Sequence, residues 1–192
     1  MSRNRVEAFS DGVVAIIITI MVLELRAPTG ANLSLLRPLT PVFLSYILSF
    51  VLVGIYWSNH HHLFQVVERV SGGVLWANLH LLFWLSLIPF ATAWMGENHF
   101  AAMPVAVYGV VLVFAAIAYF ILTRALLRIH TPDSTLAIAL GRDFKGKISI
   151  MIYLAAICLT FVRPWLGAAL YVLVEIVWLV PDRRIEKRVT AN

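Results

Sequence analysis

Long apolar segments, separated by short polar connections, limit most strongly what this chain can fold into. A helix needs about 20 apolar residues to cross the hydrocarbon core of a bilayer. Six segments approach this length: residues 6–25, 38–59, 74–94, 102–123, 148–163 and 165–181. The sequence therefore predicts an all-α membrane protein, with six transmembrane helices in a single domain over residues 1–192.

The composition excludes a water-soluble fold. Hydrophobic residues make up 61% of the 192 residues and charged residues 13%, against about 45–50% and roughly 25% in soluble domains. A core of this size cannot bury the excess, so lipid has to solvate it. The single cysteine, Cys158, rules out an intrachain disulfide, and we interpret it as a small buried apolar residue.

The basic residues indicate the orientation in the membrane. An even number of spans places both termini on one side, and that side collects twelve of the fifteen Lys and Arg residues. They are Arg3, Arg5, Arg69, Arg124, Arg128, Arg142, Lys145, Lys147, Arg183, Arg184, Lys187 and Arg188. The positive-inside rule predicts cytoplasmic termini. It also explains the net charge of +5 without nucleic-acid binding.

Polar residues at membrane depth are expensive and are candidates for functional sites. They gather at the cytoplasmic ends of the first three segments, around Ser10 and Asp11, around His60, and at Asn78. Because these groups share one depth, we expect a network of Asp11 or Ser10 with His60 and Asn78, which lipid cannot replace.

Other polar residues receive weaker interpretations. Adjacent histidines on a helix point about 100° apart, so His60, His61 and His62 do not form a metal site, and the last two are assigned no role. Glu175, a lone carboxylate in the sixth segment, is interpreted as packed or buried in its neutral form.

The first segment has an apolar stripe opposite its polar face. On a helical wheel Ile16, Ile20 and Leu23 lie close together, with Thr19 beside them. Asp11 falls about 140° from Ile16. Taken alone, such a stripe is more typical of a lipid-facing surface than of a pore.

Motifs of other functional classes are absent from the sequence. It has no G-x-S-x-G, H-E-x-x-H or phosphate-binding G-x-x-x-x-G-K-[ST] sequence, which argues against an enzyme. It also lacks the duplicated halves of many transporters, the arginine repeat of voltage sensors and the T-V-G-Y-G filter of potassium channels.

Three motifs in order resemble the endosomal and lysosomal potassium channel family, transmembrane protein 175. The first segment has Arg5, Phe9, Ser10 and Asp11, followed by Ala15, Ile16 and Thr19. The second has Trp57, His60, Phe64 and Gln65, and the third has Asn78, Leu79, Pro89 and Phe90. The match covers the first half of the chain and is typical of a short bacterial member with a single repeat.

The resemblance implies a homotetramer in which four first helices line a central pore. Ile16, Ile20 and Leu23 would form the apolar constriction, and Thr19 would be a selectivity layer. A structural polar network would hold that helix in place, and its members would be Arg5, Phe9, Ser10, Asp11, Trp57, His60 and Asn78.

We therefore expect a potassium-selective cation channel in the plasma membrane of a prokaryote. Its permeant species would be the potassium ion, with no cofactor, no bound metal, no nucleic acid and no small-molecule substrate. Two alternatives remain open at this stage. One is a proton-conducting or proton-coupled transport protein that uses Asp11 and His60 as a relay; the other is a membrane-embedded assembly subunit.

Overall fold

The computed structural model describes residues 2–131, 133–134, 136–137 and 144–179, and every element within them is helical. The α-helices are α1 (Arg3–Leu23), α2 (Thr40–Gln65), α3 (Gly72–Ser86), α4 (Ile88–Glu97), α5 (Ala102–Leu127), α7 (Phe144–Thr160) and α8 (Pro164–Leu179). A 3-10 helix, η1 (Leu33–Leu39), precedes α2. The end of the predicted sixth segment and the basic residues beyond it lie outside the described residues.

Four helical stretches in the described part are long and apolar enough to cross a membrane. They are Arg3–Leu23, Leu33–Gln65, Gly72–Glu97 and Ala102–Leu127. α8 is a shorter apolar helix, and it forms a hairpin with α7. Large apolar side chains are exposed along all of these helices. The chain is an α-helical, multi-pass membrane protein.

The third predicted segment is two helices and not one. α3 ends at Ser86 and α4 begins at Ile88, with Leu87 between them. The cause is Pro89, which has no N–H to donate and whose ring clashes with the carbonyl of the preceding turn. The predicted span over 74–94 lies within the apolar stretch Gly72–Glu97, which is interrupted at Leu87.

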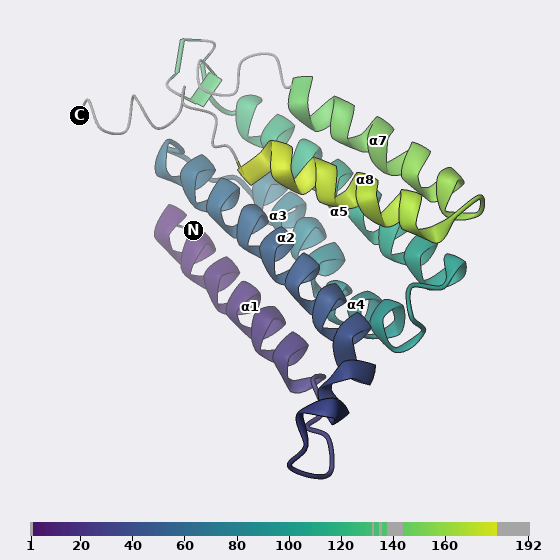
Figure 1. Ribbon diagram of the computed structural model, residues 1–192. Coiled ribbons are helices and arrows are strands. Elements are labelled where there is room, and N and C mark those ends of the chain that lie inside the picture. The colour runs from purple at the N-terminus through teal and green to yellow at the C-terminus, as the bar shows by residue number, and fades with distance from the viewer. Residues whose placement is uncertain (1, 132, 135, 138–143, 180–192) are drawn as a thin grey trace.

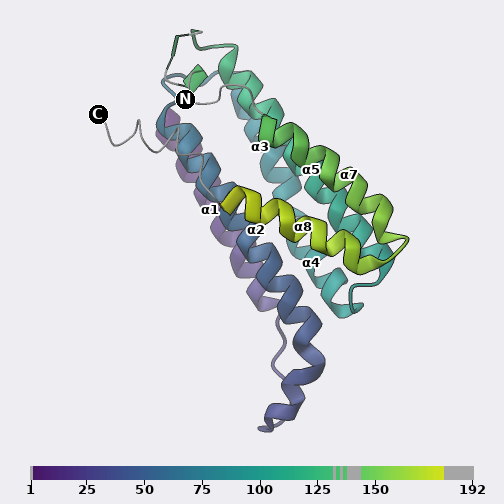
Figure 2. The same ribbon diagram turned by 45° about the horizontal axis from the view of Figure 1, so that its top comes forward.

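α5 lies at the centre of the bundle and α1 at its edge (Figure 1). Within the described residues, α5 packs mainly against α3, α4, α7 and α8, and α1 packs mainly against α2, α3 and α4. The loop from α1 through η1 extends well beyond the ends of the other helices (Figure 2). One side of α1 is therefore left without a partner within the subunit.

Buried hydroxyl groups link the central helices. The Thr92 hydroxyl of α4 donates to Ser49 Oγ of α2 over 2.6 Å, and Ser49 Oγ donates to the Tyr108 hydroxyl of α5 over 3.1 Å. On the other side of α5, the Tyr171 hydroxyl of α8 donates to the Val105 carbonyl over 3.1 Å. Each group is buried, so these bonds satisfy polar atoms that lipid could not.

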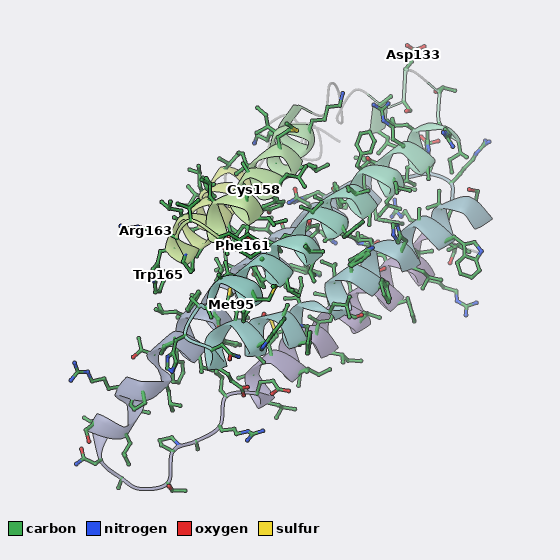
Figure 3. The ribbon with its side chains drawn as sticks, turned by 90° about the vertical axis from the view of Figure 1, so that its right-hand side faces the viewer. Met95, Asp133, Cys158, Phe161, Arg163 and Trp165 are labelled. Carbon is green, nitrogen blue, oxygen red and sulfur yellow. The ribbon has the colours of Figure 1, made fainter. Side chains whose placement is uncertain are left out.

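The α7–α8 hairpin turns over residues Phe161–Arg163 (Figure 3). Pro164 is the first residue of α8, a position where its missing N–H costs no helical hydrogen bond. Trp165 stacks on Phe100, which lies two residues before α5, with ring centroids 5.0 Å apart. Cys158 of α7 is exposed, so the interpretation of this residue as buried is wrong.

Gly96 allows α4 to lie directly against α2. A Cβ atom added at Gly96 would overlap Ser45 Oγ and approach the Val42 Cα to 2.9 Å. The second contact is with backbone, which cannot rotate away. By contrast, a Cβ at Gly54 of α2 would meet nothing within 4 Å.

We predict that Gly96→Ala destabilises the folded protein by about 1–3 kcal/mol because α2 and α4 have to separate. Gly54→Ala, the matched control, should be neutral or slightly stabilising, since alanine favours helix. The measurement is the midpoint of thermal unfolding in detergent, read as the loss of the folded peak in size-exclusion chromatography. Equal midpoints for the two variants would contradict the close packing at Gly96.

Candidate functional site

The two faces of α1 differ sharply in exposure. The buried face repeats every three or four residues and comprises Val6, Ser10, Val14, Ile17 and Met21. The opposite face contains Ile16, which is 60% exposed, Ile20 at 42% and Leu23 at 74%. Thr19 is also exposed, between Ile16 and Ile20. The apolar stripe thus points away from the subunit that carries it.

A buried hydrogen-bond chain holds the other face of α1. Asn78 Nδ2 of α3 donates to Ser10 Oγ over 2.9 Å, and Ser10 Oγ donates to the Val6 carbonyl over 2.9 Å. With its amide nitrogen used in this way, Asn78 presents Oδ1 to His60 Nε2 of α2 at 2.8 Å. His60 is therefore the donor of that bond. We call Ser10, Asn78 and His60 the polar chain.

The three members of the polar chain are almost completely inaccessible, at 1%, 2% and 5% exposed for Ser10, Asn78 and His60. The His60 ring also stacks on Phe64, with centroids 4.4 Å apart. Each donor and acceptor in the chain has a partner, so loss of any one member strands another in a site without water. Three helices are joined at one point.

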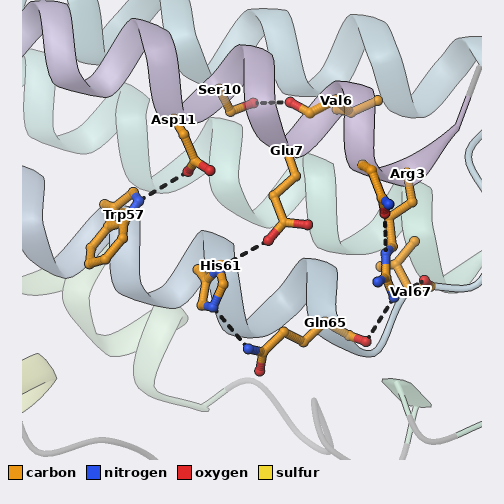
Figure 4. Close-up of polar contacts among 10 residues, drawn as sticks. Arg3, Val6, Glu7, Ser10, Asp11, Trp57, His61, Gln65 and Val67 are labelled. Carbon is orange, nitrogen blue, oxygen red and sulfur yellow. Dashed lines mark hydrogen bonds and ion pairs between the residues drawn. The ribbon is translucent and has the colours of Figure 1, made fainter.

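Asp11 does not join the polar chain. Its Oδ1 accepts a hydrogen bond from Trp57 Nε1 of α2 over 3.0 Å (Figure 4). Phe9 is 52% exposed and lies on the same side of α1 as Ile16. Arg5 is exposed and makes no side-chain hydrogen bond to the described part of the chain. The structure thus brings together Ser10, Asn78 and His60, pairs Asp11 with Trp57, and leaves Phe9 and Arg5 outside both groups.

Two further contacts repeat the Asp11–Trp57 pairing toward the start of α1 and the end of α2 (Figure 4). Glu7 Oε1 lies 2.9 Å from His61 Nδ1, and Arg3 Nη1 donates to the Gln65 carbonyl over 3.0 Å. We call these three pairs the polar ladder.

Sequence reasoning missed the polar ladder, although the sequence contains its signal. Residues 3, 7 and 11 of α1 and residues 57, 61 and 65 of α2 are each spaced by four. On a helix this spacing puts side chains on one face. Because α1 and α2 run in opposite directions, the two series meet in reverse order. His61, which was assigned no role, belongs to this series.

Thr19 satisfies its own donor within α1. Its hydroxyl donates to the Ala15 carbonyl one turn earlier over 2.8 Å. The proton is therefore directed along the helix, and the lone pairs of Thr19 Oγ1 remain free on the exposed face. An oxygen in this state can accept a hydrogen bond or contact a cation.

No group of three or more His, Cys, Asp or Glu residues suitable for a metal ion occurs in the described ranges. Glu7 and Asp11, the carboxylates of α1, are both engaged in the polar ladder. What the site presents outward is therefore a row of branched apolar side chains interrupted by one hydroxyl oxygen.

Comparison with known proteins identifies the family. Residues 5–89 match the family described as endosomal/lysosomal potassium channel TMEM175. The range includes α1 from Arg5 onward, α2, the polar chain and both partners of the Asp11–Trp57 and Glu7–His61 pairs. A potassium channel of Chryseobacterium sp. (strain P1-3) is 54% identical over 192 residues, covering 100% of both chains. The chain belongs to the TMEM175 family.

A solved structure of a TMEM175 family member has the same fold. The crystal structure of a lysosomal potassium-selective channel TMEM175 homolog from Chamaesiphon minutus superposes with a TM-score of 0.79 and 29% identity. It covers 93% of this chain and 96% of that chain. The mouse endosomal/lysosomal proton channel TMEM175 is 33% identical over 144 residues, which are 66% of this chain and 29% of that protein.

We predict that Asn78→Ala destabilises the protein by about 1–3 kcal/mol, because Ser10 and His60 both lose a partner at a buried site. The matched control is Asn98→Ala: Asn98 is exposed, and its amide bonds only to the Trp94 carbonyl of its own helix. The Asn98→Ala substitution should lower the free energy of unfolding by less than about 0.5 kcal/mol. Thermal unfolding in detergent measures both, and similar losses would argue against the polar chain as the anchor of α1.

Proposed function

We propose that this protein is a potassium-selective cation channel, built as a homotetramer whose four α1 helices surround a central pore. Each subunit would contain six membrane spans, made by α1, α2, α3 together with α4, α5, α7 and α8. The site of action would be the plasma membrane of a prokaryotic cell. The relatives named as bacterial potassium channels support this reading.

One observation carries the proposal: α1 is an edge helix that is anchored on one face and exposed on the other. Ile16, Ile20 and Leu23 are exposed to 60%, 42% and 74%, although the opposite face of α1 is hydrogen-bonded to α2 and α3. A helix that faced only lipid would not need a hydrogen-bonded orientation. A fixed rotation of α1 is needed if its exposed face packs against the α1 helices of the other subunits.

Contacts at one end of the bundle support the proposed topology. Arg3 donates to the carbonyls of Gln65 and Val67, and the Glu68 N–H donates to His130 Nε2 over 3.1 Å. The start of α1, the α2–α3 connection and the segment after α5 therefore share one side. Basic residues are concentrated in these segments, which favours the cytoplasm.

Four copies of Ile16 on the axis would form a constriction. Branched carbons offer an ion no ligand, so a narrow ring is a barrier through sterics and dewetting. Potassium loses hydration water more easily than sodium does, and the same ring would therefore favour potassium. Ile20 and Leu23 would add further apolar rings toward the outer end of α1.

Thr19 would contribute oxygen atoms next to the constriction. Its proton is held by the Ala15 carbonyl, so four Thr19 oxygens could turn lone pairs toward a partly dehydrated cation. They would replace part of the hydration shell that the ion leaves behind. This is the selectivity layer of the proposal.

The alternative of a proton relay through His60 is weaker. The polar chain ends at the Val6 carbonyl, which accepts a hydrogen bond and has no proton to pass on. His60 itself is only 5% exposed. Because the mouse relative is named a proton channel, the experiment below also measures proton conduction.

The deciding experiment is the reversal potential of the purified protein in planar bilayers under separate potassium and pH gradients. For a potassium channel, the reversal potential shifts by the Nernst value when the potassium gradient changes, and it does not change with pH. A shift that follows pH alone would establish the proton pathway instead. No current from correctly folded oligomer would favour an assembly subunit.

We predict that Ile16→Asn raises single-channel conductance several-fold and lowers the preference for potassium over sodium, because the amide wets and widens the ring. The control is Ile121→Asn on α5, the helix at the centre of the bundle, where the isoleucine is 41% exposed. It should leave both properties unchanged. Bilayer recordings in mixed potassium and sodium measure conductance and selectivity. An Ile16→Asn channel that behaves like the control would remove Ile16 from the pore.

We predict that Thr19→Val reduces potassium selectivity while the channel still conducts, since valine keeps the shape of threonine and removes the oxygen. Thr19→Ser keeps the oxygen and should retain most of the selectivity. The measurement is the shift of reversal potential when sodium replaces potassium on one side. Equal selectivity in the valine and serine variants would show that the hydroxyl does not act on the ion.

A further inference from the structure

A cavity far from the exposed face of α1 lies between α2, α5, α7 and α8. It provides about 40 Å3 for the centres of water-sized molecules, whereas one water needs about 10–15 Å3 measured in this way. Its polar and aromatic lining residues are Tyr56, Asn59, Tyr119, Phe120, Ser149, Tyr153, Glu175 and Trp178. The cavity has room for a ligand of a few heavy atoms.

Glu175 places a carboxyl group in the cavity, and one of its oxygens is unpartnered among the described residues. Its side chain is 5% exposed, and Oε1 is buried without a hydrogen-bond partner in the described part of the chain. Among the described residues that line the cavity there is no lysine, arginine or histidine. A buried carboxylate without a partner is costly, so the site is suited to a cation from outside.

The neighbouring polar groups are already occupied by one another. Trp178 Nε1 donates to Ser149 Oγ over 2.8 Å, and Ser149 Oγ donates to the Lys145 carbonyl over 2.9 Å. The Tyr119 hydroxyl donates to the Asn59 carbonyl over 3.3 Å. These donors are turned to other acceptors, and none of the three bonds reaches Glu175.

Aromatic rings from all four helices line the cavity. They are Tyr56 of α2, Tyr119 and Phe120 of α5, Tyr153 of α7 and Trp178 of α8. Tyr56 and Tyr119 meet edge to face, with ring centroids 6.2 Å apart. Ring faces attract cations, and several rings around one space form a recognised type of binding site for ammonium groups.

We propose that this cavity binds a small alkylammonium ion, with the Glu175 carboxylate as its counter-ion and the aromatic rings around its alkyl group. The ammonium N–H groups would supply the missing partner of Glu175 Oε1. The alkyl carbons would fill space that is lined mainly by apolar atoms. Glu175 then has a binding role beyond the packing interpretation drawn from the sequence.

The lining disfavours metal ions. A divalent ion such as Ca²⁺ takes six to eight oxygen ligands, and the cavity offers one carboxylate together with a few hydroxyl and amide oxygens. An alkylammonium ion needs one ion pair and gains from apolar contact. The Glu175 carboxylate can supply the ion pair, and the aromatic rings can supply the apolar contact.

The test compares ethylammonium chloride with ethanol, which has the same number of heavy atoms and no charge. The purified full-length protein is titrated in detergent with each, in a background in which potassium chloride keeps the ionic strength equal. The readout is the midpoint of thermal unfolding, which a ligand of the folded state raises. A ligand this small binds with a Kd on the order of a millimolar at the tightest.

Ethylammonium should raise the midpoint of the natural protein, whereas ethanol and additional potassium chloride should not. Glu175→Gln, which keeps the size of the side chain, should weaken ethylammonium binding about tenfold or more. Glu97→Gln, at an exposed carboxylate at the end of α4, should bind as the natural protein does. Trp178→Leu, a second variant at the cavity, should weaken binding by removing one ring.

Two results would overturn the proposal. The first is that ethanol raises the unfolding midpoint of the natural protein as much as ethylammonium does, or that neither raises it. This result is obtained with the natural protein alone. The other is equal affinity for ethylammonium in Glu175→Gln, Trp178→Leu and the natural protein, which would place the ligand elsewhere. The readout does not use ion conduction, so the result is independent of the proposed function.

Discussion

The absence of water from the bilayer interior is the constraint on which the rest of this structure depends. A polar group that enters the bundle has to find its partner in the protein. Ser10, Asn78 and His60 meet this demand by joining α1, α2 and α3 at a single point. The resulting bonds determine how α1 is rotated, and the rotation determines which side chains face outward. The exposed stripe is thus a consequence of hydrogen bonding on the opposite side of the helix.

The helices divide into two groups with different tasks. α5 contributes many of the buried side chains and organises α3, α4, α7 and α8 around itself. α1 is held at the edge by side-chain hydrogen bonds and a limited apolar face. The cavity beside Glu175 belongs to the first group, and the exposed stripe belongs to the second. The two candidate sites of the protein are therefore structurally separate.

Hydropathy was sufficient to predict an all-α, multi-pass membrane protein, because the length of an apolar run maps directly onto a spanning helix. It could not show that Pro89 splits the third segment, since the apolar composition continues across the break. Nor did it show that Cys158 faces outward, because small apolar residues serve equally well in a core and toward lipid.

For the site, shared membrane depth was enough to bring Ser10, His60 and Asn78 into one hypothesis. Depth could not decide between Ser10 and Asp11 as the partner of Asn78, because adjacent residues differ only in their direction around the helix. The packing angle of α1 decides it: Ser10 faces α3, and Asp11 turns to Trp57 of α2. The Glu175 cavity depends on contacts among four helices that no local pattern encodes.

The two faces of α1 impose a condition on the length of that helix as well as on its composition. Ser10 and Ile16 are six residues apart, and each residue turns the helix by about 100°. One residue inserted between them would leave the hydrogen bonds of Ser10 in place and rotate Ile16, Thr19, Ile20 and Leu23 toward a neighbouring helix. An insertion of seven residues would nearly restore the direction, but would displace the stripe by about 10 Å along the membrane normal. Side chains of similar character can therefore be exchanged in this segment, whereas a change in the number of residues between Ser10 and Ile16 would disturb either the anchor or the stripe.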